Sequence, residues 1–436
     1  MMKINVFGLG YVGCVSAACL ARNGNYVAGI DVDELKVNMI NNGRSPIVEP
    51  ELQETIKKAV ASNRLSATVN SIGLADISIV CVGTPSNENG SLQLDNIKKV
   101  AKQIGDYLRE IDTYHVVNIR STVLPGTIDE TVIPILEKES RKKAGVDFGV
   151  CMNPEFMREG TSIYDYHNPP FTLIGELDKK SGNVIAGIFE NLNAPIIRTS
   201  IKVAEMIKYT SNTFHALKVS FANEIGNICK NLDIDSHEVM DIFCQDTKLN
   251  LSSYYLKPGY AFGGSCLPKD LRALLYKAKE LDLDLPVMRS ILRSNDNQIE
   301  LAYKLVKKTG MKKVGVLGLS FKPGTDDLRE SPMVELIERL LGKGYEISIH
   351  DKEVSLARIV GSNKKYIEQA IPHISSLMKK SVQEVINNSK VIVVGNKSKE
   401  YEETVAGINS NTKIIDLIRI FTTLEELNGC YEGICW

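Results

Sequence analysis

The sequence of 436 residues has no long hydrophobic run. None of its apolar segments approaches the roughly 20 residues that a membrane-spanning helix needs. After Met1, Met2 and Lys3 the chain enters a short apolar run and then glycines, so the apolar region of a signal peptide has no room. These absences exclude a membrane protein, and we expect a cytoplasmic location.

An excess of charge of either sign is also missing. The chain has 52 Lys and Arg residues against 53 Asp and Glu residues, a net charge of −1. Nucleic acids and lipid surfaces are therefore not expected as partners, and a local pocket has to bind any small anionic ligand. With 43% hydrophobic and 6% aromatic residues, the composition is that of a globular protein with two or three cores.

The nine cysteines show neither a CxxC pair nor the spacing of metal ligands. We therefore expect no metal site. Most of these thiols should be reduced and buried as small hydrophobic side chains.

Short apolar runs alternate with segments of helical periodicity, and Gly, Pro, Asn or Asp bound each run. In the amino-terminal part the predicted strands are 4–7, 26–30, 77–82, 116–119, 148–152 and 171–174. Helical periodicity without an internal turn signal covers 202–232 and continues in further stretches to about residue 308. Beyond Gly310 the predicted strands are 313–321, 345–350, 391–394 and 413–415.

This alternation predicts an α/β fold. We expect two Rossmann-like, doubly wound parallel-sheet domains, joined by a long central helix and a helical middle segment. The expected domains are residues 1–198, 199–308 and 309–436.

A glycine motif follows the first predicted strand. Gly8, Gly10 and Gly13 open a helix, and Asp31 closes the next strand, which together is the context of a dinucleotide site. The glycines permit a tight turn, close approach of a pyrophosphate and close helix packing. Asp31 should accept hydrogen bonds from the ribose and repel a 2′-phosphate, which favours NAD, although Lys36 nearby weakens that inference. The alternative is a glycine-rich turn without a ligand.

A second, degenerate glycine segment begins at Gly318, where Ser320 and Pro323 replace two of the three glycines. A second dinucleotide is therefore not expected. Lys322 and Arg329 could meet a phosphate or a sugar hydroxyl, but a solvated surface loop is an equally good interpretation.

Cys266 follows the glycine pair Gly263-Gly264 and precedes Lys269 and Asp270. Amides exposed by the glycines and the adjacent cation favour a thiolate that is open to substrate. A buried structural cysteine is the alternative, and the glycines and charges argue against it.

Four polar residues, Lys208, Asn212, His215 and Asn223, fall within an arc of roughly 80° on the predicted long helix. Because the helix is otherwise apolar, we expect this face to meet a hydroxylated ligand rather than solvent.

Polar residues also stand at the ends of predicted parallel strands, the edge where α/β sheets bind ligands. Glu155 and Glu159 follow one strand and are candidates for acid and base chemistry, although Asn153-Pro154 could be a simple turn. The hydroxyls of Thr84 and Thr122 could orient a cofactor or activate water.

In their order along the chain, these motifs resemble those of the UDP-glucose/GDP-mannose dehydrogenase family. The shared segments are Gly8–Gly13, Gly83-Thr-Pro85, Ser121-Thr-Val, Asn153-Pro-Glu-Phe, Lys208-Tyr-Thr-Ser-Asn212, Phe262-Gly-Gly-Ser-Cys266 and the segment from Phe321 through Arg329 to Pro332. The details Ser45–Pro50, Asn250–Tyr255 and Glu432–Trp436 resemble the branch that acts on GDP-mannose.

The resemblance implies which residues contact the ligands. The NAD contacts it implies are Tyr11, Val12, Asp31, Lys36, Thr84, Thr122, Lys269 and Arg329. The nucleotide-sugar contacts it implies are Glu159, Lys208, Asn212, His215, Asn223, Tyr254, Tyr255, Lys257, Tyr260, Gly263 and Lys322. It also implies a homodimer or higher homo-oligomer, built on the long helix, in which subunits share their sites.

By the same resemblance the substrate is GDP-mannose, which is oxidised at C6 to GDP-mannuronate. The branch carries Arg where this chain has Lys257, and Lys lacks the bidentate fork of Arg. UDP-glucose and UDP-N-acetylmannosamine therefore remain alternative substrates.

Oxidation of an alcohol to an acid removes four electrons, so two hydride transfers and a covalent intermediate on Cys266 are expected. Lys208 and Asn212 would stabilise an oxyanion, while Asp270, Thr122 and Glu155 would handle water and protons. Two alternatives stay open: a two-electron dehydrogenase of the β-hydroxyacid type, and an NAD-binding regulator without catalysis.

Overall fold

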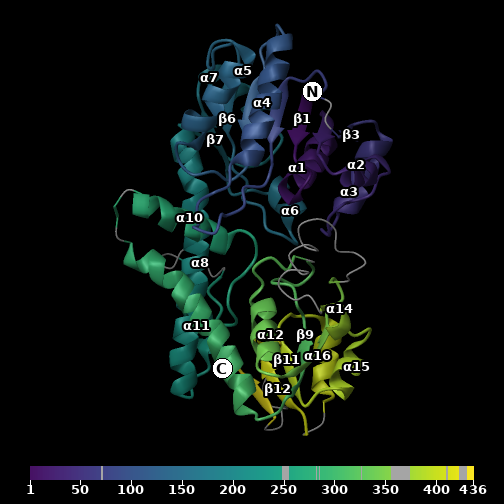
Figure 1. Cartoon of the computed structure of the whole chain (residues 1–436), viewed down its shortest axis with the longest axis vertical. Coiled ribbons are helices and arrows are strands. Elements are labelled where there is room, and N and C mark those ends of the chain that lie inside the picture. Colours follow the sequence, from purple (N-terminus) through teal and green to yellow (C-terminus); the bar gives the residue numbers. More distant parts are fainter. Residues whose placement is uncertain are drawn as a thin grey trace. The chain divides into compact units, whose positions relative to one another are not determined.

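The computed structural model describes residues 1–69, 72–247, 255–280, 282–283, 285–325, 327–354, 374–408, 411–421 and 430–436. The chain forms two compact units (Figure 1). Unit 1 comprises Met1–Ser211 and Arg272–Lys277, and unit 2 comprises Asn212–Leu271 and Ala278–Trp436. The division into three domains expected from the sequence stays a prediction.

Unit 1 is built on a sheet of eight strands in the order β3-β2-β1-β4-β5-β6-β7-β8. The strands are β1 Lys3–Phe7, β2 Tyr26–Ile30, β3 Leu65–Thr68, β4 Ile77–Val80, β5 Val116–Ile119, β6 Gly149–Met152, β7 Thr172–Glu176 and β8 Ile196–Thr199. All neighbours are parallel except β6 and β7, which pair antiparallel with Met152 opposite Gly175. The six predicted strands are confirmed. The prediction lacked β3 and β8, because neither presents a continuous apolar run to the core.

Helices cover both faces of this sheet. They are α1 Tyr11–Arg22, α2 Glu34–Asn41, α3 Leu52–Ala61, α4 Asp95–Glu110, the π-helix η1 Ile128–Val132, α5 Ile133–Ser140, α6 Ser162–His167 and α7 Lys179–Gly187. Alternate residues of β1 enter opposite cores: Ile4 and Val6 pack in the core that contains α1, and Phe7 packs in the one that contains α4. The doubly wound architecture expected from the sequence is confirmed.

Unit 2 contains a parallel sheet in the order β10-β9-β11-β12-β13. Its strands are β9 Lys313–Leu317, β10 Glu346–His350, β11 Val391–Val394, β12 Lys413–Asp416 and β13 Tyr431–Gly433. The helices are α8 Ile201–Asn231, which begins in unit 1, and then α9 Ser236–Phe243, α10 Leu267–Glu280, α11 Pro286–Lys308, α12 Pro332–Gly342, α14 Ile374–Leu377, α15 Val382–Asn387 and α16 Lys399–Ala406. Residues Arg272–Lys277 of α10 belong to unit 1. The predicted central helix and helical middle segment are confirmed, whereas β13 was not predicted.

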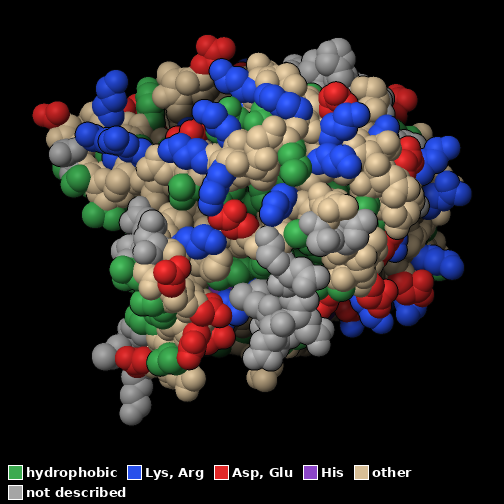
Figure 2. Space-filling model, turned by 90° about the horizontal axis from the view of Figure 1, so that it is seen from below, with side chains coloured by type: hydrophobic (Ala, Val, Ile, Leu, Met, Phe, Trp, Pro, Cys, Tyr) green, Lys and Arg blue, Asp and Glu red, His purple; other side chains and the backbone are tan. Residues whose placement is uncertain are grey.

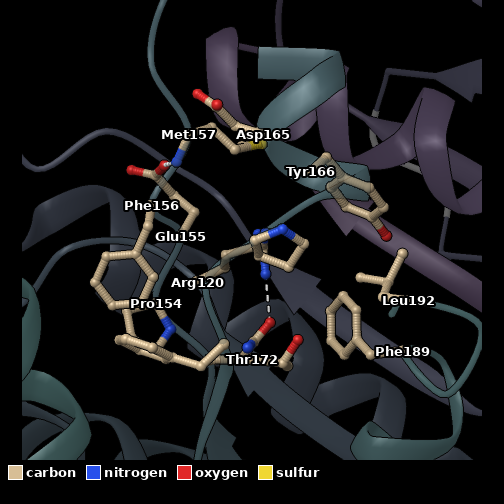
Figure 3. A pocket seen from close by; sticks show the side chains of 13 residues that line it. Arg120, Pro154, Glu155, Phe156, Met157, Asp165, Tyr166, Thr172, Phe189 and Leu192 are labelled. Carbon is tan, nitrogen blue, oxygen red and sulfur yellow. Dashed lines mark hydrogen bonds between the residues drawn. The ribbon is translucent and has the colours of Figure 1, made fainter. Parts of the chain in front are cut away.

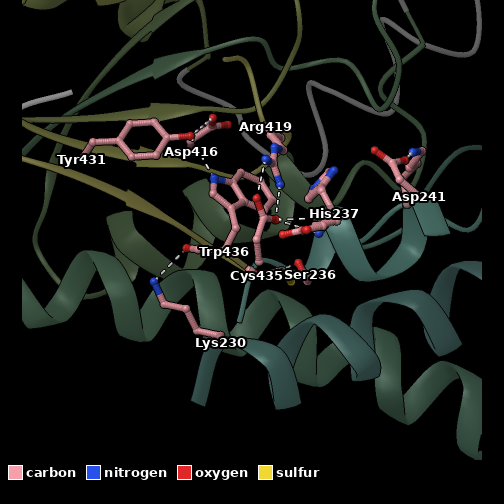
Figure 4. A network of polar contacts seen from close by, with 12 residues as sticks. Lys230, Ser236, His237, Asp241, Asp416, Arg419, Tyr431, Cys435 and Trp436 are labelled. Atoms are coloured by element: carbon pink, nitrogen blue, oxygen red, sulfur yellow. Dashed lines mark hydrogen bonds and ion pairs between the residues drawn. The ribbon is translucent and has the colours of Figure 1, made fainter. Parts of the chain in front are cut away.

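The last residues of the chain are tied to the helices of unit 2 (Figure 4). The Lys230 ammonium donates to the backbone oxygen of Trp436 at 3.0 Å, and the Trp436 indole donates to the Tyr431 hydroxyl at 2.9 Å. Arg419 forms a bidentate pair with Asp235, which caps the start of α9. This network fixes β13 at the edge of the sheet against α8 and α9.

Among the described residues, no helix is both long and apolar enough to cross a membrane. Figure 2 shows one face of the molecule, on which basic and acidic side chains are both numerous and hydrophobic side chains show between them. This mixture agrees with the net charge of −1.

Candidate active site

The glycine motif at the carboxyl end of β1 has a distinct spatial reason for each glycine. Gly8 has φ +90°, a left-handed conformation that side chains avoid. A Cβ atom on Gly13 would lie 1.7 Å from the carbonyl oxygen of Gly8, so α1 can start here only without a side chain. A Cβ atom on Gly10, the N-cap of α1, would meet nothing within 4 Å. The backbone of Gly10 is therefore open at the positive end of the helix, the position where such turns bind a pyrophosphate.

This geometry makes a prediction for two matched substitutions. Gly13→Ala forces its methyl group into the Gly8 backbone, so we expect a loss of folded protein or a fall in melting temperature by several degrees. Gly10→Ala has free space in the protein itself, so the melting temperature should stay unchanged while the Kd for NAD rises by about ten-fold or more. Thermal melts and NAD titrations of both variants check this, and an unchanged Kd in Gly10→Ala would contradict the placement of the pyrophosphate.

Asp31 lies at the end of β2, as predicted, and its carboxylate holds the glycine turn. One oxygen accepts a hydrogen bond of 2.6 Å from the amide of Leu9, and the other accepts one of 3.0 Å from Asp33. The Lys36 ammonium is 3.7 Å from the same carboxylate. Ionised carboxylates offer about four acceptor positions, so Asp31 retains capacity for a ribose hydroxyl.

The second sheet has a similar turn after β9, in which an aspartate also bonds the turn, but it lacks two of the three glycines of the motif. Gly318 has φ +93°, and Asp351 accepts a hydrogen bond of 2.7 Å from the amide of Leu319. The bond between an aspartate and the turn is thus a feature of both folds, and it is not by itself evidence for ribose recognition. What distinguishes the first turn is the open space at Gly10.

Glu49, which the sequence reasoning did not single out, joins two segments of the site. Its buried carboxylate accepts hydrogen bonds from the Tyr11 hydroxyl and from the amides of Gly160, at 2.7 Å, and Ser162, at 2.8 Å. Burial and the contact with Glu49 raise the pKa of Tyr11. Two of these three partners lie more than 100 residues from Glu49 in the sequence, so local sequence does not reveal this role.

Thr84 and Thr122 meet at the neighbouring ends of β4 and β5. The Thr84 hydroxyl donates to the carbonyl of Thr122 at 2.8 Å, and the Ser121 hydroxyl donates to the carbonyl of Val82 at 2.7 Å. Thr84 is buried, whereas Thr122 is half-buried. The two threonines, expected at strand ends, thus lie at neighbouring strand ends of one sheet.

Lys208 and Glu155 form a buried ion pair in unit 1. The ammonium of Lys208 is 2.9 Å from the carboxylate of Glu155 and 2.7 Å from its carbonyl oxygen, and both side chains are less than 10% exposed. Burial alone would raise the pKa of Glu155, but the charge and hydrogen bond of Lys208 and the charge of Arg120 lower it. Glu155 is therefore held in its ionised form.

A pocket opens beside this pair and is lined by residues from the ends of β5 and β6, from α6 and from the segment after α7 (Figure 3). Arg120 donates to Asn153 there, and Asn153 in turn donates to the carbonyl of Leu173 at 2.8 Å. Tyr166, Phe189 and other apolar side chains complete the lining. Arg120 is a site residue that the sequence reasoning did not single out, although it stands two residues before Thr122.

Cys266 differs from the other eight cysteines, all of which are described. It alone is exposed, whereas Cys244 and Cys430 are half-buried and the remaining six are buried. Burial raises the pKa of Cys14, Cys81 and Cys151 to about 12, so those thiols stay protonated. Cys266 directly precedes α10, and its carbonyl accepts the amide of Asp270 at 2.9 Å. Cys266 therefore stands at the amino-terminal, positive end of α10.

The glycine pair before Cys266 lets its loop approach the second sheet closely. A Cβ atom on Gly263 would be 2.4 Å from the carbonyl oxygen of Glu330, and one on Gly264, which has φ +87°, would be 2.8 Å from the ring of Phe321. Asn295, a residue that the sequence reasoning missed, holds the same loop by donating to and accepting from the backbone of Phe262 at 2.9 and 2.8 Å. Both contacts fix the position of the thiol within unit 2.

A second buried polar pair, Asn212 with Asp270, lies in unit 2. The side-chain amide of Asn212 donates to Asp270, and the Lys269 ammonium is 3.0 Å from the other oxygen of that carboxylate. Asp270 is 1% exposed and Asn212 is 7% exposed. The structure thus brings together three of the predicted residues beside the loop of Cys266.

The remaining predicted residues have varied surroundings. Asn223 is buried and holds the backbone of Gly259 and Tyr260, at 2.9 and 3.1 Å, with both ends of its amide. His215 contacts the ring of Tyr255, with 5.0 Å between the ring centroids. Val12, Glu159 and Lys322 are half-buried. Tyr254 lies outside the described residues.

Three further predicted residues, Lys257, Tyr260 and Arg329, also form polar contacts within unit 2. Lys257 is exposed and pairs with Asp241. The Tyr260 hydroxyl donates to the carbonyl of Pro332 at 2.9 Å. Arg329 forms a bidentate pair with Asp327, at 2.9 and 2.5 Å, which explains how a cation is held in this segment; its contact with NAD stays a prediction.

The face of α8 predicted from helical spacing is not a solvated stripe. Lys208, Asn212 and Asn223 are buried and His215 is half-buried.

Among the described residues, no group of three or more His, Cys, Asp or Glu side chains could hold a metal ion.

Comparison with known proteins bears on the whole chain. Residues 2–193 match the NAD binding domain of the UDP-glucose/GDP-mannose dehydrogenase family, residues 202–297 match its central domain and residues 315–423 match its UDP binding domain. The chain is 53% identical to the GDP-mannose 6-dehydrogenase of Pseudomonas syringae pv. tomato over an alignment of 438 positions that covers 100% of each protein.

Two solved structures have similar chains. The UDP-glucose dehydrogenase of the hyperthermophilic archaeon Pyrobaculum islandicum is 32% identical, with a TM-score of 0.90 over 100% of this chain and 98% of that one. The GDP-mannose dehydrogenase of Pseudomonas aeruginosa, in a ternary complex, is 52% identical, with a TM-score of 0.57 over 100% of both chains. The chain belongs to the UDP-glucose/GDP-mannose dehydrogenase family, and its amino-terminal domain binds NAD.

Proposed function

We propose that this protein oxidises GDP-mannose at C6 to GDP-mannuronate, using two molecules of NAD and a covalent intermediate on Cys266. The observation that carries the chemistry is the exposed thiol of Cys266 at the start of α10, because the other cysteines are buried or half-buried. The choice of sugar nucleotide is supported by the 53% identity to a GDP-mannose 6-dehydrogenase, against 32% to a UDP-glucose dehydrogenase.

NAD, when bound, supplies the acceptor for a hydride, which carries two of the four electrons. Loss of the first hydride and of the hydroxyl proton turns the C6 alcohol into an aldehyde. The Cys266 thiolate then forms a bond to the aldehyde carbon, and loss of a second hydride gives a thioester. Attack by water breaks the carbon–sulfur bond, which regenerates the thiolate and releases the acid and a proton.

Within this scheme Lys208 and Asn212 stabilise the oxyanion that forms when sulfur or water adds to the carbonyl carbon. Glu155 and Asp270, each already bonded to one of these residues, are the candidates that take up protons and orient water, together with Thr122. Because Lys208 holds Glu155 ionised, Glu155 is suited to act as a base rather than as an acid.

The ligands are assigned to the residues that the sequence singled out. NAD would be held by the turn of Gly8, Gly10 and Gly13 and by Tyr11, Val12, Asp31, Lys36, Thr84, Thr122, Lys269 and Arg329. The nucleotide sugar would be held by Glu159, Lys208, Asn212, His215, Asn223, Tyr254, Tyr255, Lys257, Tyr260, Gly263 and Lys322.

We also infer a homo-oligomer that uses α8. Along this helix the large hydrophobic side chains of Val203, Met206, Phe214 and Phe221 are each about 40% exposed or more, at spacings that keep them on one side of a helix. An exposed apolar stripe of this kind is typical of an interface, and a second copy of α8 is the occupant that the family resemblance favours. We also infer a cytoplasmic location, with which the absence of a disulfide among the nine described cysteines is compatible.

The reaction is tested by counting NADH released from purified protein with limiting GDP-mannose, UDP-glucose or UDP-N-acetylmannosamine. We expect two NADH for each GDP-mannose consumed and slower turnover with the UDP sugars. One NADH per sugar would instead support the two-electron dehydrogenase, and tight NAD binding without turnover on any sugar would support a regulator. Faster oxidation of a UDP sugar would correct the substrate but keep the chemistry.

A further inference from the structure

Glu205 carries a fully buried carboxylate in the part of α8 that belongs to unit 1, and the residue is 0% exposed. One carboxylate oxygen accepts a hydrogen bond of 2.6 Å from the backbone amide of Gly126, and the other accepts one of 3.0 Å from that of Ile128. A buried carboxylate is costly unless such donors hold it. The arrangement therefore links α8 firmly to the start of η1.

The two amides lie at the end of the loop of residues 120–127, which connects β5 to η1, and at the first residue of η1. At the start of this loop, the Ser121 hydroxyl and the carbonyl of Thr122 are bonded to residues at the end of β4. At its other end, Glu205 holds Gly126 and Ile128. Thr122 thus lies on a loop that is fixed at both ends, and one of the two anchors is a titratable side chain.

We propose that Glu205 is a positioning residue for NAD, because it ties the loop of Thr122 to α8 at a point three residues before Lys208. The inference rests on the proposed function, in which Thr122 meets the cofactor and Lys208 meets the reacting oxygen. Since one helical turn separates Glu205 from Lys208, the carboxylate sets the distance between the loop and the part of α8 that carries the ammonium.

The charge of this anchor changes near neutral pH. Burial raises the pKa of Glu205 to about 7 and the charge of Asp129 adds to the effect, whereas the two backbone hydrogen bonds and the charge of Lys202 oppose it. Glu130 also places its carboxylate beside Gly126. When Glu205 is protonated, its O–H group faces a backbone N–H, so one of the two hydrogen bonds is lost.

Two properties should therefore change with pH in opposite directions. Above pH 7 the ionised carboxylate accepts from both amides, the loop is held, and NAD binds more tightly. The contribution of Glu205 to folding stability is present in acid and is lost as the pH rises through 7, because the pKa is higher in the folded chain than in the unfolded one. If Glu205 served only to stabilise the fold, NAD affinity and folding stability would change with pH in the same direction.

The test is calorimetric titration of NAD into the full-length protein between pH 5.5 and 8.5. For the wild type we expect the Kd to rise about ten-fold, or about 1.4 kcal/mol, as the pH falls, with a midpoint near 7. Glu205→Gln keeps one acceptor and places an NH₂ group against the other amide. Its Kd should be raised about ten-fold at pH 8.5 and should be nearly constant across the range.

Two further variants separate charge from structure. Asp129→Asn removes a negative charge that disfavours ionised Glu205, so its midpoint should move to lower pH. Glu130→Gln is the matched control: it removes a carboxylate of the same turn that accepts from neither amide, and its midpoint should move less than that of Asp129→Asn.

The proposal is overturned by a wild-type Kd without this pH dependence, by a Glu205→Gln variant with the wild-type Kd, or by a weakened variant that keeps the wild-type pH profile. If Glu205→Gln does not fold, Asp129→Asn decides, and an unchanged midpoint overturns the proposal. Because the titration needs no sugar, a failure of GDP-mannose oxidation leaves this measurement intact.

Discussion

Replacement of Cys266 by alanine is expected to abolish acid formation, lowering kcat for the complete oxidation by at least about 10³-fold. Without the thiol, the aldehyde made by the first hydride transfer has no covalent partner, and the second hydride transfer has no thiohemiacetal to act on. Because Cys266 is exposed and its loop is held by the Asn295 side chain and by glycine packing, the fold and the Kd for NAD should be unchanged.

The measurement is the yield of NADH and of uronate from limiting GDP-mannose, with hydroxylamine present to trap any aldehyde. We expect at most one NADH per sugar, together with a trapped aldehyde and no acid. Ser265→Ala is the matched control, since the Ser265 hydroxyl lies 3.8 Å from the sulfur but takes no part in the proposed bonds. Normal acid production by the Cys266→Ala variant would remove the covalent scheme.

The second large effect is expected from Lys208→Met. The substitution leaves the Glu155 carboxylate buried without its cation, and breaking a buried pair in this way costs about 3–5 kcal/mol of unfolding free energy. It also removes the proposed oxyanion donor, for which a fall in kcat of about 10²–10³-fold is typical. Because Lys208 lowers the pKa of Glu155, the stabilisation by the pair is present at neutral pH and is lost as the pH falls through the acidic range.

A double variant distinguishes the two contributions. Lys208→Met combined with Glu155→Gln removes both charges, so urea unfolding should show most of the stability restored while kcat stays low. Lys36→Met is the control for loss of a cation: its pair with Asp31 is 3.7 Å long and partly exposed, so less than about 1 kcal/mol should be lost. Recovery of kcat in the double variant would show that Lys208 acts only through stability.

Much of the fold follows from local sequence. The glycines at 8, 10 and 13 have to be glycine for reasons of backbone angle and space that operate within a few residues, and Asp31 stands where a β-strand ends. The strands with continuous apolar runs were all predicted, because burial on both faces of a parallel sheet demands such runs. Strands β3, β8 and β13 were not predicted. They lie at sheet edges, where a strand is less buried and a continuous apolar run is less necessary.

The candidate site also has a part that the sequence predicts and a part that it does not. Its chemical groups can be identified from the sequence, since a thiol beside glycines and a lysine on an apolar helix are unusual wherever they occur. The hydrogen-bond and ion-pair partners of these groups cannot be identified from the sequence. Asn295 clamps the loop of Cys266 from 33 residues away, and Glu205 anchors Gly126 across 79 residues.

By itself, then, the sequence determined which elements form and which side chains are available for chemistry: the dinucleotide turn, the long helix and the one cysteine in a glycine-rich loop. The tertiary structure decided which buried polar groups satisfy one another, namely Lys208 with Glu155, Asn212 with Asp270, and Glu49 with Tyr11 and the amides of Gly160 and Ser162. The physical reason is that a buried charge or amide must find a partner, but any segment that packing brings within 3 Å can supply it, and neither spacing nor periodicity encodes that choice.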